Sequence, residues 1–155
     1  MRTRRLIVCF SILVFLPAAS YAVVFVDKDA PFGGDGNSWP TAYNSIQSGL
    51  DDADILDEEV WVAKGTYSEG IVLRDGVSLY GGFNGYGETE EANKDQRDWL
   101  NNKTIIDGKG IALHVVIGAN NSIIDGFTIT GGYARGTSFS DWGGGIYCNS
   151  TSPAI

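Results

Sequence analysis

Thr104-Ile105-Ile106-Asp107-Gly108 is followed 18 residues later by Ser122-Ile123-Ile124-Asp125-Gly126, and an Asn stands two positions before each copy, at Asn102 and Asn120. A β-branched run that is closed by Asp-Gly predicts a strand followed by a tight turn. Repetition of such a phrase at a short spacing is typical of a solenoid, in which each coil stacks on the previous one. The repeat therefore predicts a chain that winds.

Similar short runs of β-branched and aromatic residues occur along most of the chain. Groups of glycine separate them, as at Gly81-Gly82, Gly131-Gly132 and Gly143-Gly144-Gly145, and glycine supplies the positive φ that tight turns require. We expect strands of no more than about five residues. They are predicted at Val23–Val26, Val60–Ala63, Ile71–Leu73, Val77–Tyr80, Thr104–Ile106, Leu113–Ile117, Ile123–Ile124, Phe127–Thr130 and Ile146–Cys148.

One segment, from Ser38 to Asp54, has a helical pattern instead. Ser38 is a suitable N-cap residue, and Pro40 fits the first turn of a helix. A helix that precedes a coil of strands can cover the apolar interior and the unpaired edges of the first coil. We interpret the segment as a capping helix because apolar residues recur at three- and four-residue steps: Trp39, Tyr43, Ile46, Leu50 and Ala53.

The first 22 residues have the three parts of a secretory signal peptide. A cationic start with Arg2, Arg4 and Arg5 precedes an apolar run from Leu6 to Ala19, and Ser20-Tyr21-Ala22 provides a cleavage site after Ala22. The apolar run is shorter than the ~20 residues that a membrane-spanning helix needs. We therefore expect an exported chain, extracellular or on the cell surface, with no membrane insertion after cleavage.

The chain beyond residue 22 is strongly acidic. Its 8 Lys and Arg face 19 Asp and Glu, a net charge of about −11, which disfavours nucleic acid as a partner. Glu88, Glu90 and Glu91 are interpreted as a solvated charge cluster. Cys148 is the one cysteine beyond residue 22, so we expect no internal disulfide and interpret Cys148 as a small apolar strand residue.

Several phrases occur in a characteristic order and spacing: Val26-Asp27, Asp35-Gly36-x-Ser38-Trp39, Val60-Trp61-Val62-Ala63-x-Gly65-Thr66-Tyr67, Leu79-Tyr80-Gly81-Gly82-Phe83, Gln96-Arg97-Asp98-Trp99, and the run from Ile124 to Gly132. Together they resemble the N-terminal part of secreted bacterial right-handed parallel β-helix proteins of the pectate-lyase-like superfamily. Gly143-Gly144-Gly145-Ile146-Tyr147 is also similar to repeats of chlamydial polymorphic outer-membrane proteins. The resemblance implies an all-β fold, a right-handed parallel β-helix with an N-terminal capping α-helix.

The expected organisation is a signal peptide at residues 1–22, an N-terminal strand and capping helix at 23–59, and the first coils of the β-helix at 60–155. Comparable strands are expected to begin at Val60, Val77, Ile105, Ile123 and Ile146, with loops inserted at 84–103 and 133–142. Another strand is expected to begin near residues 152–155, which predicts a β-helix that is incomplete at its C-terminus. An open edge of this kind predicts self-association.

On this interpretation Asp107 and Asp125 stack on successive coils. Paired carboxylates can bind Ca²⁺ or share acid-base chemistry, but Asp before Gly is also what a tight turn requires, and we favour the turn. Lys109 is the one cation close in sequence. The lone His114, between Leu113 and Val115, is interpreted as a strand residue. We assign no residue as catalytic, cofactor-binding or metal-binding, and Ca²⁺ is the one ion considered.

Aromatic residues in or beside the two inserted loops are the one indication of binding, because they can stack on sugar rings. Alternatively, Trp99 packs its loop against the coil, with Arg97 and Asp98 holding the loop by salt bridges. The residues concerned are Tyr86, Trp99, Tyr133, Phe139 and Trp142.

Two classes of function remain open. The first, which we favour, is a non-catalytic extracellular or surface scaffold for adhesion or contact with extracellular polysaccharide. The second, which the superfamily resemblance implies, is a polysaccharide lyase or hydrolase whose active site lies on coils beyond residue 155. Fold alone does not choose between them.

Overall fold

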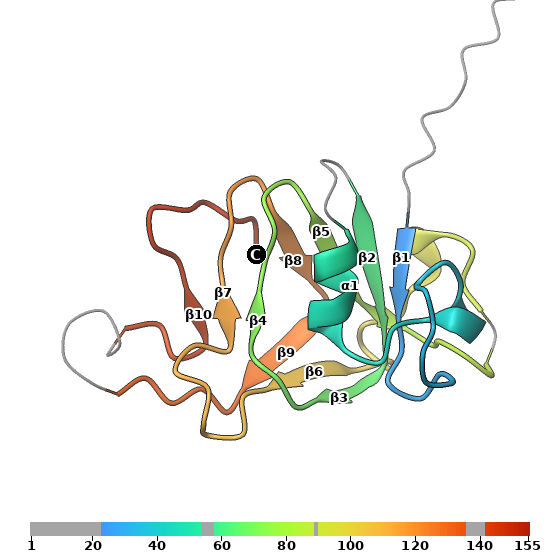
Figure 1. The fold of residues 1–155 in the computed structure, drawn as a ribbon, viewed down its shortest axis with the longest axis horizontal. Coiled ribbons are helices and arrows are strands. Elements are labelled where there is room, and N and C mark those ends of the chain that lie inside the picture. Colours follow the sequence, from blue (N-terminus) through green and yellow to red (C-terminus); the bar gives the residue numbers. More distant parts are fainter. Residues whose placement is uncertain (1–22, 54–57, 89, 136–141) are drawn as a thin grey trace, which may run out of the picture.

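The computed structural model describes residues 23–53, 58–88, 90–135 and 142–155, and it is mostly parallel β-strand with little helix (Figure 1). The predicted signal peptide and Phe139 lie outside the described residues. In chain order the elements are β1 (Val23–Val26), the 3₁₀ helix η1 (Trp39–Thr41), α1 (Ile46–Asp52), β2 (Glu59–Ala63), β3 (Gly65–Tyr67), β4 (Ile71–Val72), β5 (Ser78–Phe83), the 3₁₀ helix η2 (Lys94–Gln96), β6 (Thr104–Asp107), β7 (Val116–Ile117), β8 (Ile123–Asp125), β9 (Phe127–Thr130) and β10 (Ile146–Tyr147).

The strands form three parallel sheets, which the chain visits in a fixed order. Sheet A has the order β1-β2-β5-β8, sheet B the order β3-β6-β9, and sheet C the order β10-β7-β4. The described part of the chain therefore passes through sheets A, B and C in that order three times. The first passage is β2, β3 and β4, the second is β5, β6 and β7, and the third is β8, β9 and β10. Every pairing between these strands is parallel. The all-β parallel fold that the sequence predicts is confirmed.

The two copies of the repeated phrase lie in different sheets, so the predicted stacking of Asp107 on Asp125 is wrong. Thr104 begins β6 in sheet B, where Asp107 pairs with Thr130, whereas Asp125 ends β8 in sheet A and pairs with Tyr80. The sequence predicts that the strands at Ile105 and Ile146 are equivalent to those at Val60, Val77 and Ile123. That expectation is wrong, because Ile105 lies in sheet B and Ile146 in sheet C, whereas the other strands lie in sheet A. A β-branched run before Asp-Gly identifies a strand and a turn, but it carries no information about the sheet.

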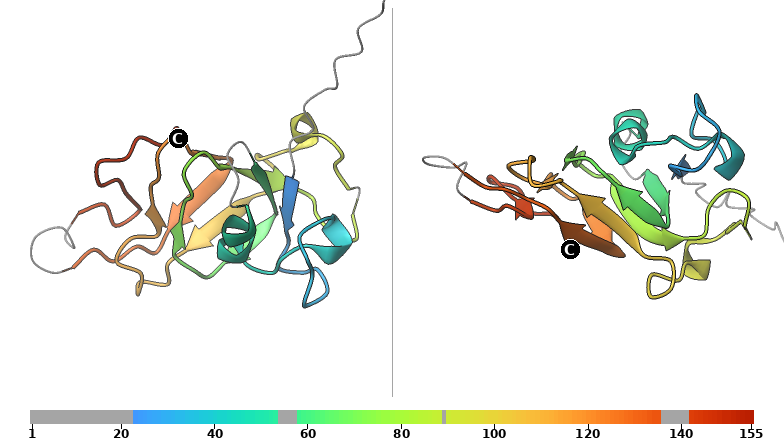
Figure 2. Two further views of the ribbon diagram at one scale, coloured as in Figure 1. Left: turned by 45° about the horizontal axis from the view of Figure 1, so that its top comes forward. Right: turned by 90° about the horizontal axis from the view of Figure 1, so that it is seen from below.

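The main hydrophobic core is formed by one face of the three sheets together with α1. Alternate residues of β2 point into it, since Val60 and Val62 belong to this core and are fully buried. The helix contributes Ile46, Leu50 and Ala53, and its position beside β1, β2 and β4 is visible in Figure 2. The other members are Val24, Val26, Tyr67, Ile71, Leu73, Val77, Leu79, Ile106, Val115, Val116, Ala119 and Ile124.

A second, aromatic core covers the opposite face of sheet A. The Trp61 and Phe83 rings stack with centroids 4.8 Å apart, and Trp39 lies 5.6 Å from Phe83 and 4.9 Å from Phe25. Rings in such pairs add about 0.5–1.5 kcal/mol beyond the area that they bury. The central strands β2 and β5 of sheet A are therefore buried on both faces.

The expected single helix from Ser38 to Asp54 is two separate elements, and only the second is α-helical. Its N-cap is Ser45, whose side chain accepts a hydrogen bond from the Ser48 N–H, while Ser38 precedes η1 without a side-chain capping bond. Between η1 and α1 the backbone of Tyr43 pairs with β1 through Phe25. That pairing interrupts the helix, and it places Trp39 in the aromatic core instead of on the face of α1.

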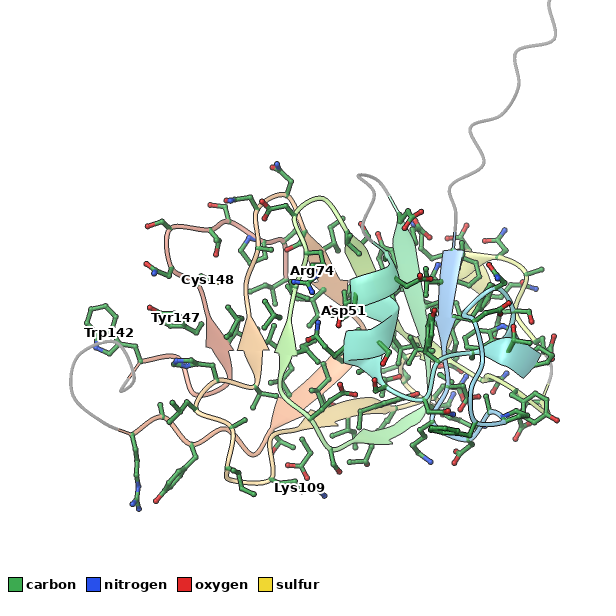
Figure 3. All side chains as sticks on the ribbon, viewed as in Figure 1. Asp51, Arg74, Lys109, Trp142, Tyr147 and Cys148 are labelled. Carbon is green, nitrogen blue, oxygen red and sulfur yellow. The ribbon has the colours of Figure 1, made fainter. Side chains whose placement is uncertain are left out.

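The contacts of α1 with the segment 69–74 attach it to the first strands. Both carboxylate oxygens of Glu69 accept backbone N–H groups at the start of α1, from Ile46 at 2.9 Å and Gln47 at 3.1 Å. The Gln47 amide oxygen accepts the Val72 N–H at 2.8 Å on the free edge of β4. Arg74 forms an ion pair with Asp51 in the last turn of α1 (Figure 3), where the cation offsets an unfavourable acid.

The first inserted loop is where the sequence places it, since β5 ends at Phe83 and β6 begins at Thr104. Figures 1 and 2 show this segment, in yellow, beside β1. The second loop, 133–142, lies partly outside the described residues. The sequence analysis predicts no strand at the position of β3, and it predicts a shorter strand than β5, which has six residues. Near residue 155, Ala154 pairs in parallel with Ile123, as expected for a segment that starts another strand.

Candidate functional site

A surface groove of about 550 Å³ lies where β8 passes into β9, beside the end of the inserted segment 84–103. One residue, Gly126, separates the two strands, and its φ of +83° lets the chain change direction between sheets A and B. The groove is lined by Trp99, Lys103, Thr104, Asp125, Gly126, Phe127 and Thr128.

Two cations fix the inserted segment to the outer side of sheet A. The Lys94 ammonium lies 2.5 Å from a Glu59 carboxylate oxygen and 4.4 Å from the centroid of the Tyr80 ring. The Arg97 guanidinium pairs with Asp125 and lies 4.9 Å from the same ring. The Glu59 hydrogen bond raises the pKa of Lys94, so the amine stays charged. Cation–π contacts of this kind contribute about 0.5–1 kcal/mol each at exposed sites.

The expected salt bridges of Arg97 and Asp98 are therefore half confirmed. Arg97 forms one, with Asp125. The Asp98 carboxylate instead accepts hydrogen bonds from the backbone of Leu100 and from the backbone and side chain of Asn101. Those bonds, the Asn101 side chain foremost, lower the pKa of Asp98. Asp98 thus shapes the turn that carries Trp99.

The backbone of Trp99 is held firmly while the residue remains half exposed. Gly82 has a φ of +99°, and a Cβ there would lie 2.8 Å from the Trp99 Cα, so only glycine allows this approach. The neighbouring Asp98 N–H donates to the Gly82 carbonyl at 2.8 Å. Trp99 as a residue nevertheless keeps 49% of its surface exposed. Its backbone therefore packs against β5, while the residue lines the groove and stays half exposed.

Among the described residues, the charged groups that line the groove are Lys103, which is unpaired, and Asp125, which is paired. Lys103 is exposed and makes no ion pair with any Asp or Glu that the structure describes. Asp125 is engaged by Arg97. The buried Thr104 hydroxyl is also engaged, since it accepts the Gly82 N–H at 2.9 Å. Lys103 is therefore the ionic group that the groove can offer to a ligand.

The other aromatic candidates do not line this groove. Tyr86, Tyr133 and Trp142 are all exposed. The Arg135 guanidinium lies 4.1 Å from the Tyr133 ring centroid, and Trp142 projects from the end of the molecule that carries β10 (Figure 3). Among the proposed aromatic residues that the structure describes, Trp99 is the one that lines this groove.

The remaining candidates have structural roles. Asp107 accepts the Lys109 N–H at 2.8 Å and forms an ion pair with its ammonium at 3.1 Å; these contacts lower the pKa of Asp107. The turn interpretation of Asp107 is supported. His114 precedes β7 instead of lying in a strand, and its ring stacks on Tyr147 with centroids 4.3 Å apart. Cys148 follows β10 and is exposed, so its interpretation as a strand residue is wrong.

The sequence missed two buried carboxylates that position the inserted segment. Asp27 accepts the Asp29 N–H and the Tyr86 N–H at 2.8 and 2.7 Å. Glu91 is 6% exposed and accepts the Asn84 N–H at 2.7 Å, so it is not part of a solvated cluster. The position of Asp27 directly after a buried strand is the one feature of the sequence that could have indicated its role. No feature of the sequence indicates that Glu91 is buried.

The described residues contain neither a cluster of metal-binding side chains nor a membrane-spanning helix. None of their His, Cys, Asp and Glu side chains form a group of three or more that could hold a metal ion. None of the helices in the same ranges is long and apolar enough to cross a bilayer.

The comparisons with known proteins give a family without an assigned activity. Residues 35–155 match the family model described as "Protein of unknown function (DUF1565)". No curated protein and no solved structure matches the chain. Because the family model covers more than half of the sequence, the chain belongs to the DUF1565 family, which is associated with β-helix proteins.

Proposed function

We propose that the three sheets are the first coils of a right-handed parallel β-helix, capped at one end by β1 and α1. The repeated passage of the chain through sheets A, B and C in the same order supports this proposal, as does the family match. Parallel crossover connections are right-handed in about 98% of cases. The finer kinship with pectate-lyase-like proteins, or with chlamydial surface proteins, rests on the quoted sequence phrases.

The function that the groove favours is non-catalytic contact with an extracellular glycan. The observation that carries this proposal is that Trp99, a half-exposed residue, lines a groove of about 550 Å³ while its backbone is fixed against Gly82. An indole buries a large area and offers a flat face, and a sugar ring presents a complementary flat apolar face. A fixed backbone lowers the entropy cost of ordering the indole on binding.

Export of the chain would place this groove where glycans occur. The cationic start, the apolar run and the Ser20-Tyr21-Ala22 site are the features that support export. The net charge of about −11 beyond residue 22 keeps such a chain soluble and disfavours nucleic acid. The proposed localisation is therefore extracellular or at the cell surface.

The test is affinity electrophoresis of the full chain in gels that contain dextran, dextran sulfate or polygalacturonate. Trp99→Ala should abolish the retardation that the wild-type chain shows in at least one gel. Trp142→Ala is the matched control, because Trp142 is 60% exposed and lies outside the groove, and it should leave retardation unchanged. Equal loss in both variants, or no retardation of the wild-type chain, would refute a glycan site at Trp99.

Catalysis can be separated from binding by an assay of the full-length protein, because the lyase alternative places the active site on coils beyond residue 155. Incubation of the full-length protein with polygalacturonate and Ca²⁺, followed by absorbance of unsaturated sugar ends, reports lyase activity. The scaffold proposal expects no release above a blank. Release that disappears with a chelator would replace it by the lyase alternative.

A further inference from the structure

The groove carries a local positive charge on an otherwise acidic molecule. Eight Lys and Arg and 19 Asp and Glu follow residue 22, so an unpaired cation on the surface is unusual. Lys103 lines the groove, is exposed, and has no acidic partner among the described residues. Its ammonium remains available to a ligand.

Asp125, the one carboxylate among the described residues that line the groove, is already neutralised. Asp125 forms an ion pair with Arg97, whose side chain is only 15% exposed and also lies over the Tyr80 ring. An Arg97 guanidinium nitrogen also donates to the Gly81 carbonyl oxygen at 3.5 Å. Arg97 therefore has little freedom to leave Asp125.

We propose that the ligand of this groove carries an anionic substituent, a carboxylate or a sulfate ester, and that Lys103 binds it directly. This inference rests on the proposed glycan contact at Trp99, which supplies the stacking, while Lys103 supplies the selection for charge. A divalent cation is not needed as a bridge. Such an ion prefers several carboxylate or carbonyl oxygens, and the Asp125 carboxylate is held by Arg97.

The division of roles predicts which property each residue controls. Trp99 should contribute to the binding of neutral and anionic glycans alike, because stacking does not depend on the substituent. Lys103 should contribute only to anionic ones, and salt should weaken its contribution. An exposed ion pair is worth up to about 1 kcal/mol, so loss of Lys103 should weaken anionic binding by about fivefold.

The experiment uses two pairs of probes that differ in charge on one backbone. Dextran and dextran sulfate form the first pair, and an oligogalacturonate and its methyl ester form the second. Dissociation constants are measured by calorimetry for the full wild-type chain, Trp99→Ala, Lys103→Met and Lys109→Met. Lys109 is the matched control, because it is also exposed but is paired with Asp107 away from the groove.

The proposal expects tighter binding of the anionic member of at least one pair, and which pair shows it distinguishes a sulfate from a carboxylate ligand. Lys103→Met should remove the difference within that pair, Lys109→Met should not, and EDTA should have no effect. Equal binding of both members, with loss of both in Trp99→Ala, would overturn this inference and leave the proposed function standing. Abolition by EDTA would overturn direct recognition. Failure of every probe would overturn both proposals.

Discussion

Substitution of Gly126 by Ala tests the corner at which β8 becomes β9. Gly126 has a φ of +83°, and an added Cβ would lie 2.6 Å from the Gly81 carbonyl oxygen and 3.1 Å from the Gly81 carbonyl carbon. Both atoms belong to the backbone of β5, so no side-chain rotation can relieve the contact. The corner must open, or β5 and β8 must separate.

The size of the effect can be worked out by comparison with Gly110→Ala. Gly110 also has a positive φ, +67°, but an added Cβ there would meet no atom within 4 Å. Both variants incur the left-handed strain of about 1–2 kcal/mol, and only Gly126→Ala adds the backbone clash, at about 1–3 kcal/mol. With a urea m-value of about 2 kcal/mol per molar, the extra cost lowers the unfolding midpoint by about 1 M relative to Gly110→Ala.

The measurement is urea unfolding of the two variants and the wild-type chain, followed by circular dichroism and by tryptophan fluorescence. Coincident transitions in the two signals would justify a two-state free energy. Equal midpoints for Gly126→Ala and Gly110→Ala would refute the close approach of the Gly126 corner to β5.

Three further predictions concern the N-terminal region. Glu69→Gln replaces the carboxylate that accepts the Ile46 and Gln47 N–H groups, so the urea unfolding free energy should fall by about 1–2 kcal/mol. Burial, and to a lesser degree Asp27, raises the pKa of Tyr67 above its ordinary value of 10.0. The folded state therefore keeps the phenol neutral, and the stability that this contributes is complete below pH 10 and is lost as the pH rises above it. The free energy of unfolding, measured against pH in this range, should decline less steeply in Tyr67→Phe than in the wild-type chain. Hydrogen bonds, the largest effect from the Thr41 hydroxyl and the next from Asn37, lower the pKa of Asp35 from 3.8 to about 2. The stability that these bonds contribute is present above pH 3.8 and is lost as the pH falls toward 2. Carbon-detected NMR titration of Asp35 should give a midpoint near 2.

Each of these predictions has a result that contradicts it. Wild-type stability in Glu69→Gln would mean that α1 is not capped by that carboxylate. An identical high-pH decline in wild type and Tyr67→Phe would remove Tyr67 as its cause. A midpoint for Asp35 near 3.8, unchanged in Thr41→Val, would exclude the hydroxyl as the source of the lowered pKa.

The local elements were largely predictable, and their assignment to sheets was not. Strand β1 was predicted to the residue, because its β-branched pattern and its flanks are unambiguous. The phrase at Thr104 and the phrase at Ser122 look alike because each needs only a strand and a turn. Which sheet a strand joins depends on the corners before it, and Gly126 turns the chain within one residue. Pairing partners far apart in sequence leave no local signal of this kind.

The candidate site was predictable only in part. The sequence indicates that Trp99 belongs to an inserted segment, and the Gly81-Gly82 pair indicates a turn that requires positive φ. It does not indicate that Asp98 bonds to Gly82, or that Arg97 reaches Asp125 across 28 residues. Nothing in the sequence indicates a role for Lys103. Its role arises because Asp125, the acidic residue beside it in the groove, is already paired with Arg97. These are properties of the assembled groove.

The most direct test of a glycan site at Trp99 is a titration of the ¹⁵N-labelled chain with oligosaccharide, followed through its four indole N–H signals. The Trp39 and Trp61 indoles are hydrogen-bonded, to the Glu91 carbonyl at 3.2 Å and to Glu59 at 2.8 Å, and should not move. Single Trp→Phe variants assign the four signals. The account predicts that the Trp99 signal shifts and saturates while the Trp142 signal remains in place. A saturating shift of Trp142, with Trp99 unchanged, would contradict it.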